Sequence, residues 1–459
     1  MQSSISTRQS LRRPTLATTC FGLFTLFLLA GYALLDRGFA YLGLPPYAYV
    51  GEFGLLLGLL TLGTVLHVRL WQSSVTWLLL AFMLWGLART LPYISTYGID
   101  SLRDAVIWAY AVYALAVATA VLRLNAFEGI IELYSRALPI FLILAPILFA
   151  LHAFADDLIP RWPWGPQDVS IINPKPGDLA THYAGAFTFI VSGLSATTFD
   201  TLWFALWVVG AVPLITYSRA SLVTIASAVG LVMLLRPTLK SYYTLAVAGM
   251  CLLLVLLVIS AGNVGLTIQG RRSVSAEQML ENVESIFSND VRPDLDLEGT
   301  KRWRELWWNK IVDYTVYGQY FWTGKGFGVN LADDDGFTLG DDHTLRSPHS
   351  GHMTILARMG VPGLALWVIL QLLFSLKLFM NFWRDRLFNK RLSALELWVL
   401  LYWLSFIING SFDVFLEGPQ GGIWFWSVFG FGLSLIVGHR RLTQESAVAR
   451  RSGSPNLST

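Results

Sequence analysis

Residues 241–262 read SYYTLAVAGMCLLLVLLVISAG, and residues 351–381 read GHMTILARMGVPGLALWVILQLLFSLKLFMN. Each run is long and apolar enough to cross a bilayer, because a membrane helix needs about 20 mostly apolar residues. The stretch between them, 262–350, holds 14 of the 30 acidic residues and ends in Arg346-Ser347-Pro348-His349-Ser350. This pattern predicts a membrane bundle interrupted by one long polar loop.

The composition of the whole chain agrees with a membrane protein. Of its 459 residues 54% are hydrophobic and only 14% are charged, whereas soluble proteins carry roughly 25% charged residues. The net charge is only +3, so no nucleic-acid partner is expected. The two cysteines, Cys20 and Cys251, both fall inside apolar runs, which indicates neither a disulfide framework nor a metal cluster.

The apolar runs predict roughly twelve membrane spans in an all-α polytopic protein. They lie near 16–36, 47–67, 74–92, 104–123, 137–155, 181–196, 199–217, 219–236, 241–262, 351–381, 395–410 and 421–438. We therefore expect nine membrane helices within 1–261, a large loop at 262–350, three more helices within 351–438 and a tail at 439–459. The first run is longer than the apolar core of a cleaved signal and lacks a small-residue cleavage site, so it is expected to remain as the first helix.

The basic residues of the short loops predict the orientation, because Lys and Arg concentrate in cytoplasmic loops. Alternate segments carry the larger share of them: Arg8, Arg12, Arg13, Arg69, Arg123, Arg136, Arg236, Lys240, Arg384, Arg386, Lys390, Arg391, Arg440, Arg441, Arg450 and Arg451. Both termini are then expected to be cytoplasmic and the loop 262–350 extracytoplasmic. Within this loop, Trp303, Trp307, Ile311 and Tyr314 follow helical spacing, which predicts a helix over about 300–320.

Three residues are the candidates for chemistry. Arg219 stands between two apolar runs, and a charge at membrane depth indicates function unless the side chain reaches the interface. Arg302 precedes Trp303, a pair suited to an anionic ligand with rings, although a solvated arginine fits the pattern too. His349 lies at the outer rim of the membrane, where a neutral imidazole can accept a proton from a hydroxyl; the alternative is a structural histidine.

Further residues are candidates for substrate binding. They are Arg89, a second intramembrane charge, Arg346 beside the histidine, Trp303, and Glu417 in the short outside loop 411–420. The aromatic ring of Trp303 offers a flat face for a sugar, although packing on the membrane explains it equally well. The acidic cluster from Asp333 to Asp342 either holds a divalent cation or is a solvated turn.

The two motifs around Arg219 and His349 resemble those of one known family. Pro348-His349-Ser350-Gly351-His352 followed by Gly360-Val361-Pro362-Gly363 is similar to the His-x10-Gly signature of the O-antigen ligase and polymerase superfamily. The opening Thr216-Tyr217-Ser218-Arg219-Ala220-Ser221 resembles the family's other marker, and Arg302 has the expected place between them. Ser350 and Arg358 depart from the family pattern, where Asn and an acidic residue are common.

The resemblance implies a GT-C-like membrane glycosyltransferase of the bacterial inner membrane with its site on the periplasmic side. Such an enzyme moves a glycan from undecaprenyl diphosphate to a hydroxyl of a glycan or glycolipid acceptor and needs neither a cofactor nor a metal. Arg219 and Arg302 are then expected to stabilise the diphosphate and His349 to activate the hydroxyl. A ligase is favoured over a polymerase of lipid-linked repeats. A protein O-oligosaccharyltransferase and a glycolipid transporter are the further alternatives.

Overall fold

The computed structural model describes most of the chain. The described residues are 15–237 apart from 45–47, 65, 165–168 and 196–199; the pieces 242–243, 246–247, 249–250, 267–268 and 272–273; and 297–451 apart from 339–342 and 344. The predicted span at 241–262 therefore lies almost entirely outside the described residues, as does the first part of the large loop.

The described chain is overwhelmingly helical. Its helices are α1 (Leu16–Leu35), α2 (Arg37–Ala40), α3 (Val50–Thr64), α4 (Ser74–Thr90), α5 (Ile94–Tyr97), α6 (Ile99–Ala109), α7 (Ala111–Leu124), α8 (Phe127–Ala155), α9 (Pro176–Val191), α10 (Asp200–Tyr217), α11 (Arg219–Leu235), α14 (Leu297–Thr315), α15 (Leu331–Asp335), α16 (Gly351–Asp385), α17 (Lys390–Phe412) and α18 (Pro419–Arg451). Short 3-10 helices are η1 (Val68–Gln72), η2 (Leu91–Tyr93), η3 (Asp156–Leu158) and η4 (Phe415–Glu417). Two antiparallel pairs, β1 (Gly43–Leu44) with β2 (Ala48–Tyr49) and β3 (Thr267–Ile268) with β4 (Arg272–Ser273), complete it.

The all-α membrane architecture is confirmed. Among the described residues, six helices are long and apolar enough to cross a membrane, and a seventh span forms if α6 and α7 count together across their 44° bend. Helices α3, α10 and α11 are apolar but shorter. Each predicted run other than 241–262 overlaps a described helix or, for 104–123, the bent pair α6 and α7, whereas the total of twelve spans stays a prediction.

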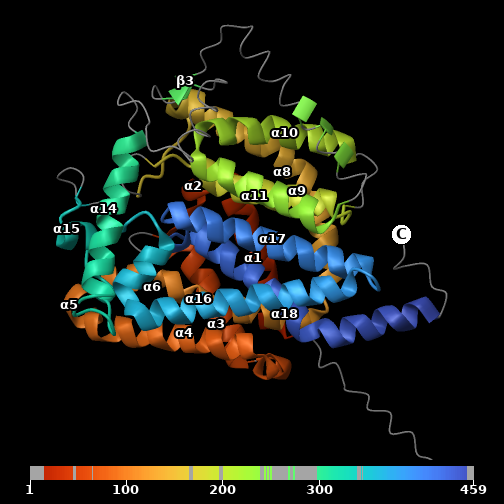
Figure 1. Cartoon of the computed structure of the whole chain (residues 1–459), viewed down its shortest axis with the longest axis horizontal. Helices are drawn as coiled ribbons and strands as arrows, with labels where there is room; N and C mark the ends of the chain where they lie inside the picture. Colours follow the sequence, from red (N-terminus) through yellow and green to blue (C-terminus); the bar gives the residue numbers. More distant parts are fainter. Residues whose placement is uncertain are drawn as a thin grey trace, which may run out of the picture.

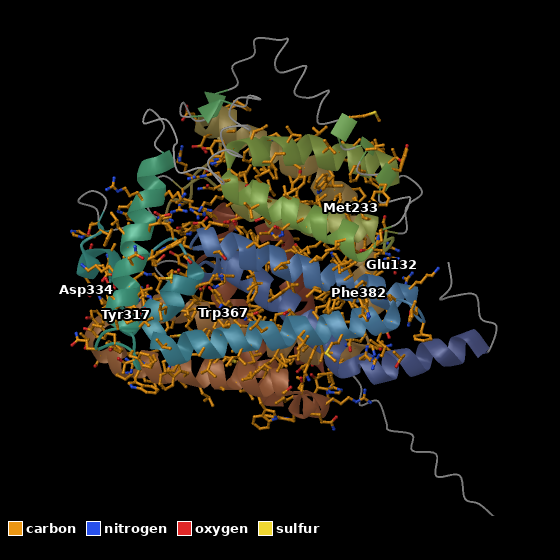
Figure 2. The ribbon with its side chains drawn as sticks, in the orientation of Figure 1. Glu132, Met233, Tyr317, Asp334, Trp367 and Phe382 are labelled. Carbon is orange, nitrogen blue, oxygen red and sulfur yellow. The ribbon has the colours of Figure 1, made fainter. Side chains whose placement is uncertain are left out.

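The long helices lie side by side, and α14 crosses one end of their bundle (Figure 1). We call this end, where α16 begins and α17 ends, the loop end; the opposite end, where α16 ends and α17 begins, is the tail end. Figure 2 places Tyr317 and Asp334 at the loop end, and Glu132 and Met233 towards the tail end. The central helix α17 is buried along most of its length, because apolar helices surround it.

Helix α14 confirms the helix predicted inside the large loop. Trp307 and Ile311, one turn apart on one face, are fully buried against α15 and against Leu356 and Ala357 of α16. Its apolar stripe therefore packs on the first turns of α16 and builds a small second core. This packing holds α14 against the start of α16, close to His349.

Helix α16 is broken at Gly360, and the loop fills the break. Gly360 has φ 68° and ψ −173°, a conformation that is essentially confined to glycine. The main-chain groups released there find partners in the loop: Val361 N donates to Phe321 O at 2.8 Å, and Lys325 N donates to Ala357 O at 2.7 Å. The glycine of the His-x10-Gly signature is thus the point at which the large loop enters the helix ladder.

Candidate active site

Four helix ends bring a group of charged side chains together at the loop end. His349 precedes α16, whose N-cap Ser350 accepts a hydrogen bond from Met353 N, and Asp413 is the C-cap residue of α17. Lys175 is the N-cap residue of α9, and Arg37 opens α2. Helix ends leave unsatisfied backbone groups and so favour polar residues, which explains why these charges gather in one layer.

Asp413 lies at the centre of this group. Its Oδ1 is 3.7 Å from Nδ1 of His349 and accepts a hydrogen bond from Val414 N at 2.8 Å. Its Oδ2 pairs with Lys175 Nζ and lies 4.0 Å from Nη2 of Arg37. The carboxylate is therefore fixed by its own helix end and by two cations, and it faces the imidazole at slightly more than hydrogen-bond distance.

Asp178 and Asp36 form a second acidic layer around the same cations. Asp178 is buried, lies 3.9 Å from Arg37 Nε and accepts a hydrogen bond from Asn409 Nδ2 at 3.0 Å. Asp36 Oδ2 accepts a hydrogen bond from Lys175 N at 2.7 Å. Burial and the neighbouring Asp178 raise the pKa of Asp36 well above its ordinary value.

His349 has a lowered pKa and a partly exposed side chain. Burial, followed by the charges of Arg304, Lys175 and Arg37, lowers its pKa to about 4, so the imidazole is unprotonated near pH 7. Its side chain is still 29% exposed, which leaves room for a substrate. With Nδ1 turned to Asp413, the proton-accepting nitrogen is Nε2 if Nδ1 carries the proton.

On α14, the arginine that faces this cluster is Arg304. Its Nη1 donates to Phe412 O at 3.0 Å, burial and the charge of Arg219 lower its pKa, and its own charge acts on His349. Arg302 is exposed, because two helical positions turn a side chain by about 200°. The predicted role of Arg302 stays a prediction, and Arg304 is the arginine that sequence reasoning missed.

Arg219 and Trp303 lie where sequence reasoning expected them. Arg219 is the first residue of α11, capped by Ser218, and its charge reaches Arg304. The Trp303 ring lies 5.9 Å from the His349 imidazole in an edge-to-face arrangement. Trp308 Nε1 donates to Pro348 O at 2.8 Å, which holds the segment before His349 against α14. Their roles in catalysis and sugar binding remain predictions.

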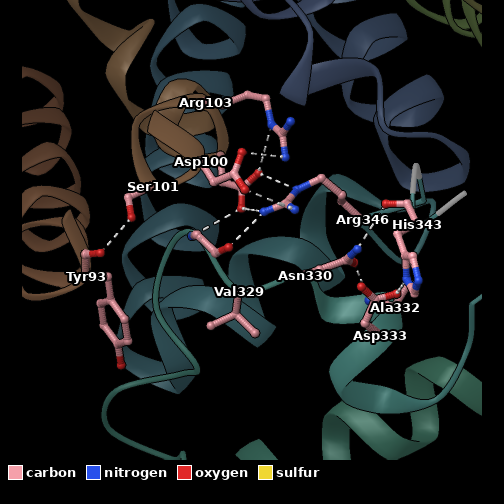
Figure 3. Close-up of polar contacts among 12 residues, drawn as sticks. Tyr93, Asp100, Ser101, Arg103, Val329, Asn330, Ala332, Asp333, His343 and Arg346 are labelled. Atoms are coloured by element: carbon pink, nitrogen blue, oxygen red, sulfur yellow. Dashed lines mark hydrogen bonds and ion pairs between the residues drawn. The ribbon is translucent and has the colours of Figure 1, made fainter. Parts of the chain in front are cut away.

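Arg346 and Arg89 contact partners outside the cluster around His349. Arg346 Nη2 lies 2.9 Å from Asp104 Oδ2 and from Gly328 O, and Figure 3 shows it turned towards the acidic side chains of α6. Arg358, 1% exposed, pairs with the same Asp104 at 2.9 Å. Arg89 donates to Thr323 O at 2.6 Å. These arginines attach the loop to the bundle, and substrate binding by Arg89 or Arg346 remains a prediction.

The structure also shows the positions of Glu417 and of Asp333, Asp334 and Asp335 from the acidic cluster. Glu417 lies in η4, accepts a hydrogen bond from Thr354 at 2.7 Å, and has its pKa raised to about 7 by burial. Asp334 and Asp335 both pair with Lys325. The exposed Asp333 pairs with His343 at 2.9 Å, while Asp341 and Asp342 lie outside the described residues. Cation binding by this cluster stays untested.

An apolar cavity of about 560 Å³ lies between α1, α7, α8, α17 and α18. It opens on the side of the bundle, because exposed residues such as Leu23 and Ile140 line it. Its few polar wall residues include His182, whose Nδ1 lies 2.7 Å from the Tyr402 hydroxyl. His182 is one helical turn from Asp178 on α9, so the cavity comes within about one turn of the charged cluster. The apolar cavity and the charged cluster are therefore neighbours.

Asp413, Lys175, Arg37 and Arg304 are the cluster members that sequence reasoning did not select. Arg37 and Lys175 stand in segments between the predicted apolar runs, and Asp413 stands in the short loop 411–420. The signal in the sequence was their position. Arg37, Lys175 and Asp413 all stand near the ends of apolar runs, on the side of the membrane where the large loop was expected. For Arg304 the signal was a second arginine on the loop helix, which spacing alone could not orient.

The fold and the site define a polytopic all-α membrane protein with a basic, histidine-containing cluster at one end and an apolar cavity close by. Residues 204–368 match the family model described as O-Antigen ligase, from α10 to the first half of α16. This segment is therefore similar to the O-antigen ligase family, and the match supports the resemblance of the two motifs to that superfamily. No curated protein matches the chain. Asp413, Lys175 and Arg37 lie outside the matched segment.

Proposed function

We propose that this protein transfers a glycan from undecaprenyl diphosphate to an acceptor hydroxyl, as an O-antigen ligase in surface-polysaccharide synthesis, with its loop end facing the periplasm of the bacterial inner membrane. The observation that carries the proposal is that His349, Arg304 and Arg219 lie at one end of an apolar bundle, where the charge of Arg304 acts on His349 and the charge of Arg219 acts on Arg304. The basic residues next to the tail end of α16 and α17 support the orientation.

In the proposed reaction, Nε2 of His349 takes the proton of the acceptor hydroxyl as its oxygen attacks the anomeric carbon of the donor glycan. The bond from that carbon to the diphosphate breaks, and the diphosphate leaves with the bonding electrons. Arg219 and Arg304 face the developing negative charge, which fixed cations stabilise without reorganisation. The imidazolium then releases its proton to solvent. Asp413 is a positioning residue, because it faces Nδ1 on the opposite side of the ring.

The lipid part of the donor suits the apolar cavity. An isoprenyl chain has no polar groups, and the cavity wall is almost wholly apolar, so the chain can pack there by van der Waals contact as it does among lipid tails. This position places the diphosphate towards the charged layer. The reaction as written uses no metal or nucleotide, because the diphosphate is already a good leaving group. EDTA added at the start of an assay is expected to leave the initial rate unchanged.

The decisive test compares His349→Ala and Arg219→Ala with His343→Ala. His343 is a matched control because it lies in the same loop with nearly the same φ, 51° against 52° for His349, but is exposed and paired with Asp333. Purified full-length variants are given lipid-linked glycan and acceptor. A loss of roughly 10²-fold or more is expected for the two site variants, and none for the control. Near-normal transfer by both site variants would refute the proposal.

A deletion strain separates the ligase from the polymerase. Its surface glycan is resolved on a gel before and after complementation with the wild-type gene. Accumulation of long lipid-linked polymer with none on the acceptor identifies a ligase. A single repeat unit on the acceptor identifies a polymerase and overturns the finer part of the proposal.

A further inference from the structure

Three buried ionisable residues meet at the tail end, far from His349. Asp385 is the last residue of α16, Glu396 lies near the start of α17, and His439 lies on α18. Their exposures are 3%, 0% and 5%. They join three neighbouring helices at the end of the bundle opposite α14 (Figure 1). Nothing in the proposed transfer reaction uses them.

The side-chain oxygen and nitrogen atoms of these three residues lie close together. Nδ1 of His439 lies 3.1 Å from Oε1 of Glu396 and 3.7 Å from Oδ2 of Asp385, and one atom from each residue lies within 4.8 Å of the others. Zinc bonds to nitrogen and oxygen of about 2.0–2.2 Å in a tetrahedron place neighbouring ligand atoms about 3.4 Å apart. The two short distances bracket this value, so only small side-chain movements are needed.

Each of the three residues has a buried polar atom without a hydrogen-bond partner in the described part of the chain. Oε2 of Glu396, Oδ2 of Asp385 and Nε2 of His439 are buried without a hydrogen-bond partner among the described residues. Of the described cations, Arg384 is the one within ion-pair distance; it is 58% exposed and reaches Asp385 Oδ1 at 3.8 Å. Buried carboxylates of this kind are normally paired with a cation or bound to a metal.

We propose that Asp385, Glu396 and His439 bind a divalent transition-metal ion of the zinc class. An imidazole nitrogen with two carboxylates suits zinc and its neighbours better than magnesium or calcium, which prefer ligand sets made wholly of oxygen. The ion neutralises the two carboxylates and fastens α16, α17 and α18 to one another. The site lies at the opposite end of the bundle from His349, so the ion is independent of the proposed glycan transfer.

The first test measures bound metal. The full-length protein is purified in detergent without a polyhistidine tag, and its zinc is quantified by elemental analysis and by competition with a chelator. About one tightly bound zinc per chain is expected in the wild type. His439→Gln and Glu396→Gln, which preserve side-chain size, are expected to bind it more than about 100-fold more weakly. His343→Gln removes an exposed histidine that also faces a carboxylate and should keep the zinc.

The second test needs only the wild type. Thermal unfolding is followed with added zinc and with EDTA, and a higher melting temperature in zinc is expected because the ion binds the folded chain. Equal melting temperatures in zinc and EDTA overturn the proposal, as does zinc that persists in both His439→Gln and Glu396→Gln. If His343→Gln is the only variant that loses zinc, the metal binds at the loop end, and the proposal is also overturned.

Discussion

Replacing Arg304 by glutamine should move the acidic limit of activity to higher pH. Among the charges that lower the pKa of His349, that of Arg304 has the largest effect, second only to burial. Glutamine removes that charge while keeping a donor for the carbonyl of Phe412. The imidazole of the variant is then protonated more easily, so its pKa rises towards the ordinary value.

The structure bounds the size of this effect. Only neutral His349 can accept a proton, so wild-type activity is retained above the pKa of about 4 and lost as the pH falls through it. At about pH 5.5 a histidine of pKa about 4 is roughly 97% neutral, whereas one at the ordinary 6.5 is roughly 9% neutral. The rate of the variant at this pH, relative to its own rate at about pH 8, should therefore fall by up to about tenfold.

The assay is the initial rate of glycan transfer by purified enzyme at both pH values. Taking the ratio of the two rates for each variant cancels any uniform loss of activity, and comparison with the wild type cancels titration of the substrates. Arg302→Gln is the matched control, because Arg302 lies on the same helix but is exposed. An unchanged acidic limit in Arg304→Gln, or a wild-type limit near pH 6.5, refutes this account of His349.

Three further changes have expected outcomes. Asp413→Asn should lower kcat by roughly 10²-fold with little change in KM, because it removes the carboxylate that faces Nδ1 of His349; steady-state kinetics decide this. Asp104→Asn should destabilise the fold by about 3 kcal/mol, because the buried Arg358 loses its ion-pair partner; thermal unfolding measures it. Gly360→Ala should cost about 1–3 kcal/mol, since its φ is 68°, and should lower the melting temperature.

Each of the two stability predictions has a control substitution. Asp100→Asn changes a half-exposed carboxylate one turn before Asp104, and it should leave the melting temperature nearly unchanged. Gly129→Ala adds a methyl group to an exposed helix position with nothing within 4 Å, and it should be neutral or slightly stabilising. Equal effects of a control and its partner substitution contradict the corresponding argument.

The helices were predictable because lipid makes one strong demand on the sequence. A spanning helix needs an apolar run of fixed minimum length, and that demand is visible at 16–36 or 395–410 without any knowledge of packing. The bend between α6 and α7, which lies inside the predicted run 104–123, has no such signal. The break at Gly360 has one in hindsight, in a glycine followed closely by Pro362.

The site was predictable only in part, because it is assembled from segments far apart in the chain. His349 and Trp303 were selected from local motifs and do lie together. The choice between Arg302 and Arg304 needed the rotation of α14 relative to the bundle, which depends on how Trp307 packs. The ion pair between Arg346 and Asp104 joins residues 242 positions apart, and no local pattern reports such a partner.

The way the large loop enters α16 limits how these proteins can diversify. Because Phe321 and Lys325 complete the main-chain hydrogen bonds on either side of Gly360, the loop and the first turns of α16 form one structural unit. A graft of the loop from a relative with another acceptor should fold only if it carries its own stretch down to this glycine. Exchange at the membrane boundary near residue 350 would separate the two halves of a shared hydrogen-bond ladder.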